Sequence, residues 1–219
     1  MKGNTMDFEA LKKNFEELNE QVAAARKEMQ AKSTGFVEAA CKQFFDACPE
    51  VKSVFWTQYT PYFNDGEACE FSVYDKYFTL FGAEADYDDE EGSVLYTEKD
   101  LNQAKERLVE AEKYTADPNT WIENYKKEYH KKYGRDWGSY SQPKPYPSDP
   151  EEAKERLEEI ESFLEKYPLE TTQRIDESFS ALQSALNMID EDIMQAIYGD
   201  HVKVTITRAG TDIDEYDHE

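Results

Sequence analysis

Apolar residues recur at alternating steps of three and four positions near both ends of this chain, and this repeat constrains the fold more than any other feature. Such a repeat places its residues on one stripe of an α-helix that packs against another helix. The N-terminal stripe, on a helix expected from about Asp7 to Lys32, comprises Phe8, Leu11, Phe15, Leu18, Val22, Ala25 and Met29. The C-terminal stripe, on a helix expected from about Glu170 to Tyr198, comprises Ile175, Phe179, Leu182, Leu186, Ile189, Ile193 and Ala196. We expect the two long helices to lie against each other, within one chain or in a dimer.

Glycine, proline and capping residues predict where the other helices begin and end. Gly35 is expected to end the first helix, and a helix with a broad apolar face is expected over residues 36–48, before Pro49. Three more helices are predicted, each with its own start or stop signal: 101–111 after a cap at Thr97 and Asp100, 119–133 before Gly134, and 150–167 with Pro150 in its first turn.

Two segments rich in β-branched and aromatic residues predict a small sheet. Residues 51–81 read as a hairpin with a long, irregular loop, and the alternation in residues 202–208 predicts a third strand beside it. The expected fold class is α+β, in which mostly long helices pack with this antiparallel sheet. We expect one domain over residues 1–210 with a Pro-rich linker at 138–150, followed by an acidic, mobile tail at 211–219.

The negative charge of the chain is concentrated in blocks. The formal net charge is −23, yet residues 101–147 contain 7 acidic and 9 basic residues, whereas residues 61–100 contain 12 and 2. Residues 148–198 contain 14 and 4. Long-range repulsion from these acidic blocks opposes binding to a polyanion, so we expect no direct contact with nucleic acid. Aromatic residues in the basic segment are therefore expected in the core, namely Trp121, Tyr125 and Tyr129.

The acidic blocks favour a first functional hypothesis, an acidic protein-interaction module. Dense carboxylates on a helix can imitate the charge spacing of nucleic acid, so the chain would block the basic cleft of a host or defence protein. The candidate partner-binding residues in the loop are Glu84, Asp86, Asp88, Asp89, Glu90 and Glu91. Those on the helix at 150–167 are Glu151, Glu152, Glu155, Glu158 and Glu159. The partner would be a basic protein, such as a nucleic-acid-binding enzyme.

The string WTQYTPYFNDGEACEF, from Trp56 to Phe71, is the most distinctive in the chain. It resembles the hairpin of small, functionally uncharacterised phage-encoded proteins that carry similar WxQYTPYFNDG strings. The resemblance covers about 16 residues and implies a phage origin, which suits counter-defence in a host cytoplasm. Because functional groups collect on loops held by strands, Tyr59, Tyr62, Asn64 and Asp65 are further candidates for partner binding. The alternative is that the string only packs across strands.

Recognisable sites for chemistry are absent from the sequence. None of the common nucleotide-binding, hydrolase or metalloprotease motifs occurs, and the spacing of Cys41, Cys48 and Cys69 matches no zinc knuckle. We therefore expect no catalytic residue, no metal and no cofactor. No apolar run approaches the roughly 18 residues that span a bilayer, and we expect a cytoplasmic protein without a membrane partner.

The alternative function is a structural or assembly protein that oligomerises through the heptad helices, for example as a homodimer. An enzyme with an unfamiliar site is a third option.

Overall fold

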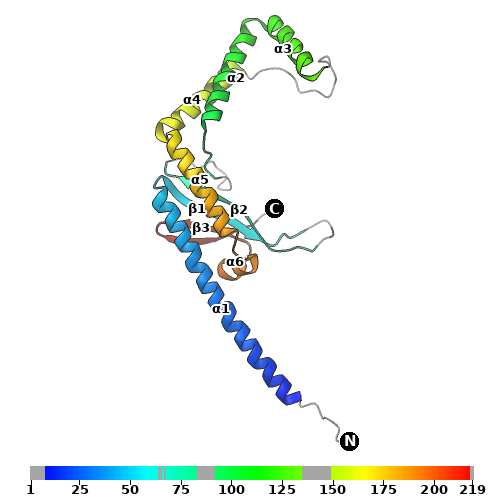
Figure 1. The fold of residues 1–219 in the computed structure, drawn as a ribbon, viewed down its shortest axis with the longest axis vertical. Coiled ribbons are helices and arrows are strands. Elements are labelled where there is room, and N and C mark those ends of the chain that lie inside the picture. The colour runs from blue at the N-terminus through cyan, green and yellow to red at the C-terminus, as the bar shows by residue number, and fades with distance from the viewer. Residues whose placement is uncertain (1–7, 64–65, 67, 83–91, 135–148, 218–219) are drawn as a thin grey trace. The chain divides into compact units, whose positions relative to one another are not determined.

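The computed structural model describes the chain except for residues 1–7, 64–65, 67, 83–91, 135–148 and 218–219. It is an α+β protein with a small antiparallel sheet, so the expected fold class is confirmed (Figure 1). The chain divides into two compact units, where the sequence pattern predicts one domain. The first unit combines Met1–Ser93 with Glu177–Glu219, and the second is Val94–Asp176. Most of the predicted linker at 138–150 lies outside the described residues.

The sheet of the first unit has the strand order β2-β1-β3-β4. Strands β1 (Val51–Tyr59) and β2 (Ser72–Leu80) form the predicted hairpin, and β3 (Val202–Thr207) pairs antiparallel with the other side of β1, as expected. Strand β4 (Gly210–Glu215) then pairs with β3, although a mobile tail is predicted from residue 211. The difference arises because a two-residue turn at 208–209 returns the chain along β3, which supplies a ready-made pairing partner.

Helix α1 (Phe8–Ala47) is one continuous helix, so the predicted interruption at Gly35 is wrong. A glycine inside a helix costs only about 1 kcal/mol relative to alanine, and the surrounding residues outweigh this cost. The C-terminal end of α1 is tied to the sheet by Arg208, whose guanidinium donates to the carbonyl oxygens of Phe45 at 2.8 Å and Cys48 at 3.1 Å. The last carbonyl groups of a helix have no hydrogen-bond donor within the helix, and the Arg208 guanidinium supplies donors for them.

The predicted C-terminal helix is two helices, α5 (Leu169–Leu186) and α6 (Glu191–Tyr198). The break occurs because Asp190 caps α6, with its carboxylate accepting from the Asp192 amide at 3.0 Å. Gly199 directly follows α6, as expected, and its φ of 100° is one that glycine adopts most readily. The same heptad pattern therefore continues through a turn that the spacing alone does not reveal.

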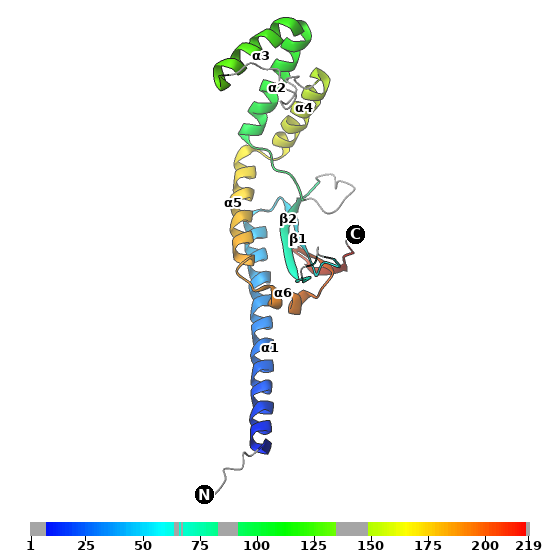
Figure 2. The ribbon, with the colours of Figure 1, turned by 90° about the vertical axis from the view of Figure 1, so that its right-hand side faces the viewer.

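The core of the first unit lies between one face of the sheet and its helices (Figure 2). From the sheet, Val54, Trp56 and Val204 are completely buried. From the helices, Phe44 of α1 meets Phe179 of α5 at a ring-centroid distance of 5.7 Å. The C-terminal stripe packs into this core, since its members Phe179, Leu182 and Leu186 are buried. The described residues of the N-terminal stripe are exposed, so the expected pairing of the two stripes within one chain is wrong, whereas their pairing in a dimer stays a prediction.

The second unit packs α2 (Glu98–Ala116) against α4 (Pro150–Lys166) around Tyr96, Ala104 and Ile160. The predicted caps are confirmed: Thr97 and Asp100 form a capping box at α2, and Pro150 lies in the first turn of α4 after the N-cap Asp149. The separate apolar cluster gives this segment a core of its own.

Helix α3 (Pro118–Tyr133) ends at Gly134, which adopts a left-handed conformation as expected. No described residue of α3 is buried, so the expectation that Trp121, Tyr125 and Tyr129 lie in the core is wrong. Their rings instead lie side by side along the helix: Trp121 stacks on Tyr125 at a centroid distance of 5.4 Å, and Tyr125 lies tilted beside Tyr129 at 6.3 Å. The three side chains are half-buried, and Trp121 also packs edge-on against Tyr114 of α2.

Candidate functional site

The strongest candidate surface is the N-terminal stripe of α1, where large apolar side chains face solvent. Phe15 is 66% exposed, Leu18 52%, Val22 44% and Met29 54%. Ala25 is exposed as well, whereas the side chains of Phe8 and Leu11 lie outside the described part of α1. At about 100° per residue, the five residues from Phe15 to Met29 fall within an arc of about 80°. They form one continuous apolar surface, which we call the α1 stripe: Phe15, Leu18, Val22, Ala25 and Met29.

The α1 stripe does not continue the face that α1 turns toward its own core. The core-facing residues of the C-terminal half are Val37, Cys41, Phe44 and Phe45, all buried. By the same helical arithmetic, the centre of this core face lies about 100° around the helix from the centre of the stripe. In Figures 1 and 2 the N-terminal half of α1 extends past the sheet of its own unit. Helix α1 therefore carries two apolar faces, and within the described residues only the core face packs against other elements of the chain.

The residues beside the α1 stripe have an uneven charge distribution. In a heptad labelled a to g, Phe15, Val22 and Met29 occupy a, while Leu18 and Ala25 occupy d. Position e carries Lys12, Asn19 and Arg26, and position g carries Asn14, Gln21 and Glu28. Lys32 occupies the next d position, where its ammonium lies 2.7 Å from a Glu28 carboxylate oxygen, so the apolar seam stops there.

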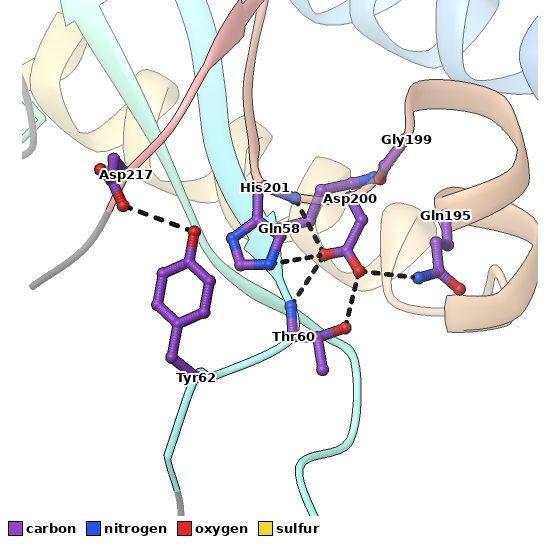
Figure 3. Close-up of polar contacts among 8 residues, drawn as sticks. All are labelled: Gln58, Thr60, Tyr62, Gln195, Gly199, Asp200, His201 and Asp217. Atoms are coloured by element: carbon purple, nitrogen blue, oxygen red, sulfur yellow. Dashed lines mark hydrogen bonds and ion pairs between the residues drawn. The ribbon is translucent and has the colours of Figure 1, made fainter.

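A second candidate is a polar and aromatic cluster at the base of the hairpin loop (Figure 3). The Asp200 carboxylate accepts hydrogen bonds from the Thr60 amide at 2.8 Å, the Thr60 hydroxyl at 2.7 Å and the His201 amide at 2.9 Å. The side-chain amide of Gln195 donates to it at 3.2 Å. Partial burial by itself would raise the pKa of Asp200, but the donors from Thr60 and His201 outweigh it and hold this pKa below its ordinary value.

The aromatic residues of this cluster stack on one another. Tyr59 stacks on Tyr74 at a centroid distance of 4.2 Å, and Tyr62 stacks on His201 at 4.7 Å. His201 itself has a φ of 54°, a left-handed conformation uncommon outside glycine. Of the predicted loop candidates, Tyr59 and Tyr62 thus come together with residues about 140 positions away, whereas Asn64 and Asp65 lie outside the described residues. The sequence does not predict Asp200 and His201 as members of this cluster, because no local pattern links them to the hairpin.

Other residues of the distinctive hairpin string hold the fold. Trp56 is fully buried and meets Tyr198 edge-on at 5.5 Å. Its indole N–H donates to Gln58, whose amide in turn donates to the carbonyl oxygens of Met194 at 3.2 Å and Gly199 at 2.6 Å. For these residues, the packing interpretation of the string is the one that the contacts favour.

The acidic candidates on α4 are divided between two sides of the helix. Glu159 accepts from the Tyr96 hydroxyl at 2.5 Å and from Arg156 at 2.6 Å, and these hydrogen bonds lower its pKa despite partial burial. Glu152 and Glu155 line an open groove with Arg107 and Arg156. Glu158 pairs with Lys154 at 3.3 Å. Several of the predicted carboxylates are therefore close to bases of the same unit.

The other acidic candidates, Glu84, Asp86, Asp88, Asp89, Glu90 and Glu91, lie outside the described residues. Within the described part, no group of three or more His, Cys, Asp or Glu side chains is arranged to hold a metal ion.

Burial raises the pKa of Cys41 to about 12, so its thiol stays protonated and is a poor nucleophile at neutral pH. No helix in the described residues has both the length and the apolar character to cross a membrane.

Comparison with known proteins gives no relative: no family model, no curated protein and no solved structure matches the chain.

Proposed function

We propose that this chain is an assembly protein, in which the α1 stripe joins two copies as a parallel, two-stranded coiled coil. The observation that carries the proposal is the exposure of Phe15, Leu18, Val22 and Met29 on a single stripe. A helix exposing such a stripe to water gains about 1.5–3 kcal/mol for each large apolar side chain that a partner helix buries. The stripe's separation from the core face explains why the chain's own sheet does not bury it.

The flanking charges favour a second copy in parallel orientation. In an antiparallel pair with full overlap of the stripes, position e faces position e, so Lys12 of each copy would face Arg26 of the other. In a parallel pair, position g faces position e of the next heptad, so Gln21 faces Arg26 and Asn14 faces Asn19. The parallel arrangement brings no like charges together at positions e and g. The antiparallel arrangement brings together two pairs of like charges, each between Lys12 of one copy and Arg26 of the other.

Gln21→Glu tests both the association and its orientation. In the parallel pair the new carboxylate faces Arg26 of the other copy twice, and we expect the dissociation constant to fall about threefold to tenfold, since each such pair contributes a few tenths of a kcal/mol or more. Sedimentation equilibrium at low salt measures the change. An antiparallel pair would instead place the new carboxylates of the two copies against each other. Weaker association of this variant therefore contradicts the parallel arrangement, and monomeric wild-type protein contradicts the proposal as a whole.

A second candidate function is the acidic interaction module, here a phage-type inhibitor that mimics nucleic-acid charge and blocks a basic partner. The observation in its favour is the spacing of Glu151, Glu155, Glu158 and Glu165, which places them on the side of α4 opposite the buried Ala153 and Ile160. Within the described residues, Glu151 and Glu155 form no ion pair. The pairing of Glu158 and Glu159 with bases on the same helix lowers the net field of this surface.

The charge-reversed variant Glu151→Lys, Glu155→Lys, Glu158→Lys tests the inhibitor function. If α4 imitates nucleic acid, the wild-type protein captures a DNA-binding protein from a host lysate, and added duplex DNA releases it. The reversed variant is then expected to bind that protein about tenfold or more weakly. The matched control reverses Glu98, Glu106 and Glu110 on α2, which are exposed in the same unit. Equal loss with both variants, or no competition by DNA, counts against mimicry at α4.

A further inference from the structure

The two edges of the sheet differ in how they are covered. The outer edge of β2 is covered in part: the Ser93 amide donates to the Phe78 carbonyl at 2.7 Å, the Ser93 hydroxyl accepts from the Leu80 amide at 2.9 Å, and the Gln183 side chain donates to the Lys76 carbonyl at 3.0 Å. Strand β4, at the opposite edge, pairs within the described residues only with β3, and all six of its residues are exposed. An uncovered edge strand presents unpaired backbone donors and acceptors to any extended segment that approaches it.

The phase of the β3–β4 ladder identifies which backbone groups of β4 point outward. The two strands are joined by a two-residue turn, and the Tyr216 amide donates to the His201 carbonyl at 2.8 Å just beyond their last strand pair. Because hydrogen-bonded and non-hydrogen-bonded pairs alternate in an antiparallel ladder, Asp212 and Asp214 direct their backbone groups to β3. Thr211, Ile213 and Glu215 then direct theirs to the open edge.

A groove lies beside this edge. It has a volume of about 460 Å³ and is lined by Thr211 and Ile213 of β4, by α6 at residues 196–198, and by α1 residues between Lys27 and Glu38. Ile213 is 47% exposed, and the small side chain of Ala31 lies on the α1 wall. The groove thus offers an apolar contact on the helix side of the edge, with room for side chains of an added strand.

The side chains on the opposite face of β4 determine which charges an added strand can carry. Asp212 and Asp214 alternate with Ile213, and within the sheet Asp214 pairs in register with Lys203 of β3. Directly opposed like charges destabilise a strand pair, so two copies joined edge to edge through β4 would oppose their aspartates. An incoming strand with Lys or Arg beside these aspartates and Val or Ile beside Ile213 complements both faces, as Val202, Lys203 and Val204 do on the β3 side.

We propose that the open edge of β4 binds an extended segment of another protein, in which basic residues alternate with β-branched apolar ones, as a fifth strand of the sheet. The outward backbone groups of Thr211, Ile213 and Glu215 supply the affinity common to strand addition, and the groove and the aspartates supply its specificity. This site is separate from the α1 stripe. By helical spacing, the stripe lies on nearly the opposite side of α1 from the groove residues Lys27 and Thr34.

The test uses a fluorescein-labelled peptide, TKVKVKVT, titrated with the full-length protein by fluorescence anisotropy at physiological salt. We expect saturable binding, and at least tenfold weaker binding of the matched peptide TEVEVEVT, since its carboxylates face Asp212 and Asp214. No saturable binding of TKVKVKVT at protein concentrations up to about 1 mM overturns the proposal. Equal affinity for the two peptides also overturns it.

Two pairs of protein variants separate strand addition from general attraction to an acidic protein. Ile213→Pro removes an outward N–H, whereas Ile213→Ala removes the side chain but keeps that N–H, so we expect the proline variant to bind at least tenfold more weakly than the alanine variant. Asp212→Lys with Asp214→Lys should abolish binding. Glu70→Lys with Asp75→Lys, which alters exposed acids elsewhere in the same unit, should retain it. Equal binding within either pair, with circular dichroism confirming folded protein, contradicts the site.

Discussion

Leu18→Glu is expected to convert the proposed dimer to a monomer. Leu18 occupies a d position near the middle of the α1 stripe, so in a two-stranded coiled coil both copies would bury it. Replacing two buried leucines by charged residues removes at least about 3 kcal/mol of burial and adds the cost of desolvating two carboxylates. The dissociation constant should therefore rise more than about 100-fold, which sedimentation velocity over a dilution series measures.

The matched control for this variant is Ala24→Glu, which adds the same charge on the same part of α1. Residue 24 lies away from the stripe, at a solvent-facing heptad position, and it is exposed. We expect it to associate as the wild type does. Since Leu18 is itself 52% exposed in the described chain, both variants should keep the unfolding midpoint of the monomer. A Leu18→Glu variant that associates as tightly as the control would show that the stripe is not the contact.

Gln58→Met is expected to destabilise the first unit by at least about 3 kcal/mol, because three groups lose a partner and each buried polar group left without one costs about 1–3 kcal/mol. The side chain of Gln58 is fully buried, and its amide serves three groups: the Trp56 indole and the carbonyl oxygens of Met194 and Gly199. Methionine has a similar length and volume but offers none of these hydrogen bonds. Urea unfolding followed by tryptophan fluorescence measures the loss.

The control for this substitution is Gln103→Met, an identical chemical change at an exposed position of α2. Surface changes of this kind usually alter stability by no more than about 0.5 kcal/mol. If Gln58→Met unfolds at the same urea concentration as wild type, the hydrogen-bond network that joins β1 to α6 does not contribute to stability.

Local signals predicted much of the secondary structure because they act within a few residues. The capping box at Thr97, the proline at the start of α4 and Gly134 at the end of α3 each satisfy or limit backbone groups in a single turn. Gly35 failed as a stop signal because the energetic penalty of one glycine is small beside the stability of a 40-residue helix. The heptad spacing runs through Asp190, so the pattern does not indicate this residue as a cap.

The candidate surfaces were predictable only where they depend on periodicity. The α1 stripe follows from the heptad spacing, but its exposure does not, since the sequence does not reveal which face of α1 the sheet covers. The joining of Asp200 to Thr60 across 140 positions has no local signature. The charge counts identified α4 as acidic, yet they could not reveal that Arg156 and Tyr96 would engage Glu159.

The most direct test of assembly through α1 is the mass of the wild-type protein in solution, measured by multi-angle light scattering on full-length chain at several concentrations. We predict a mass close to twice the chain mass of 25.5 kDa, falling toward 25.5 kDa only on dilution or in the Leu18→Glu variant. A wild-type mass of 25.5 kDa at every concentration up to the solubility limit would contradict assembly through the α1 stripe.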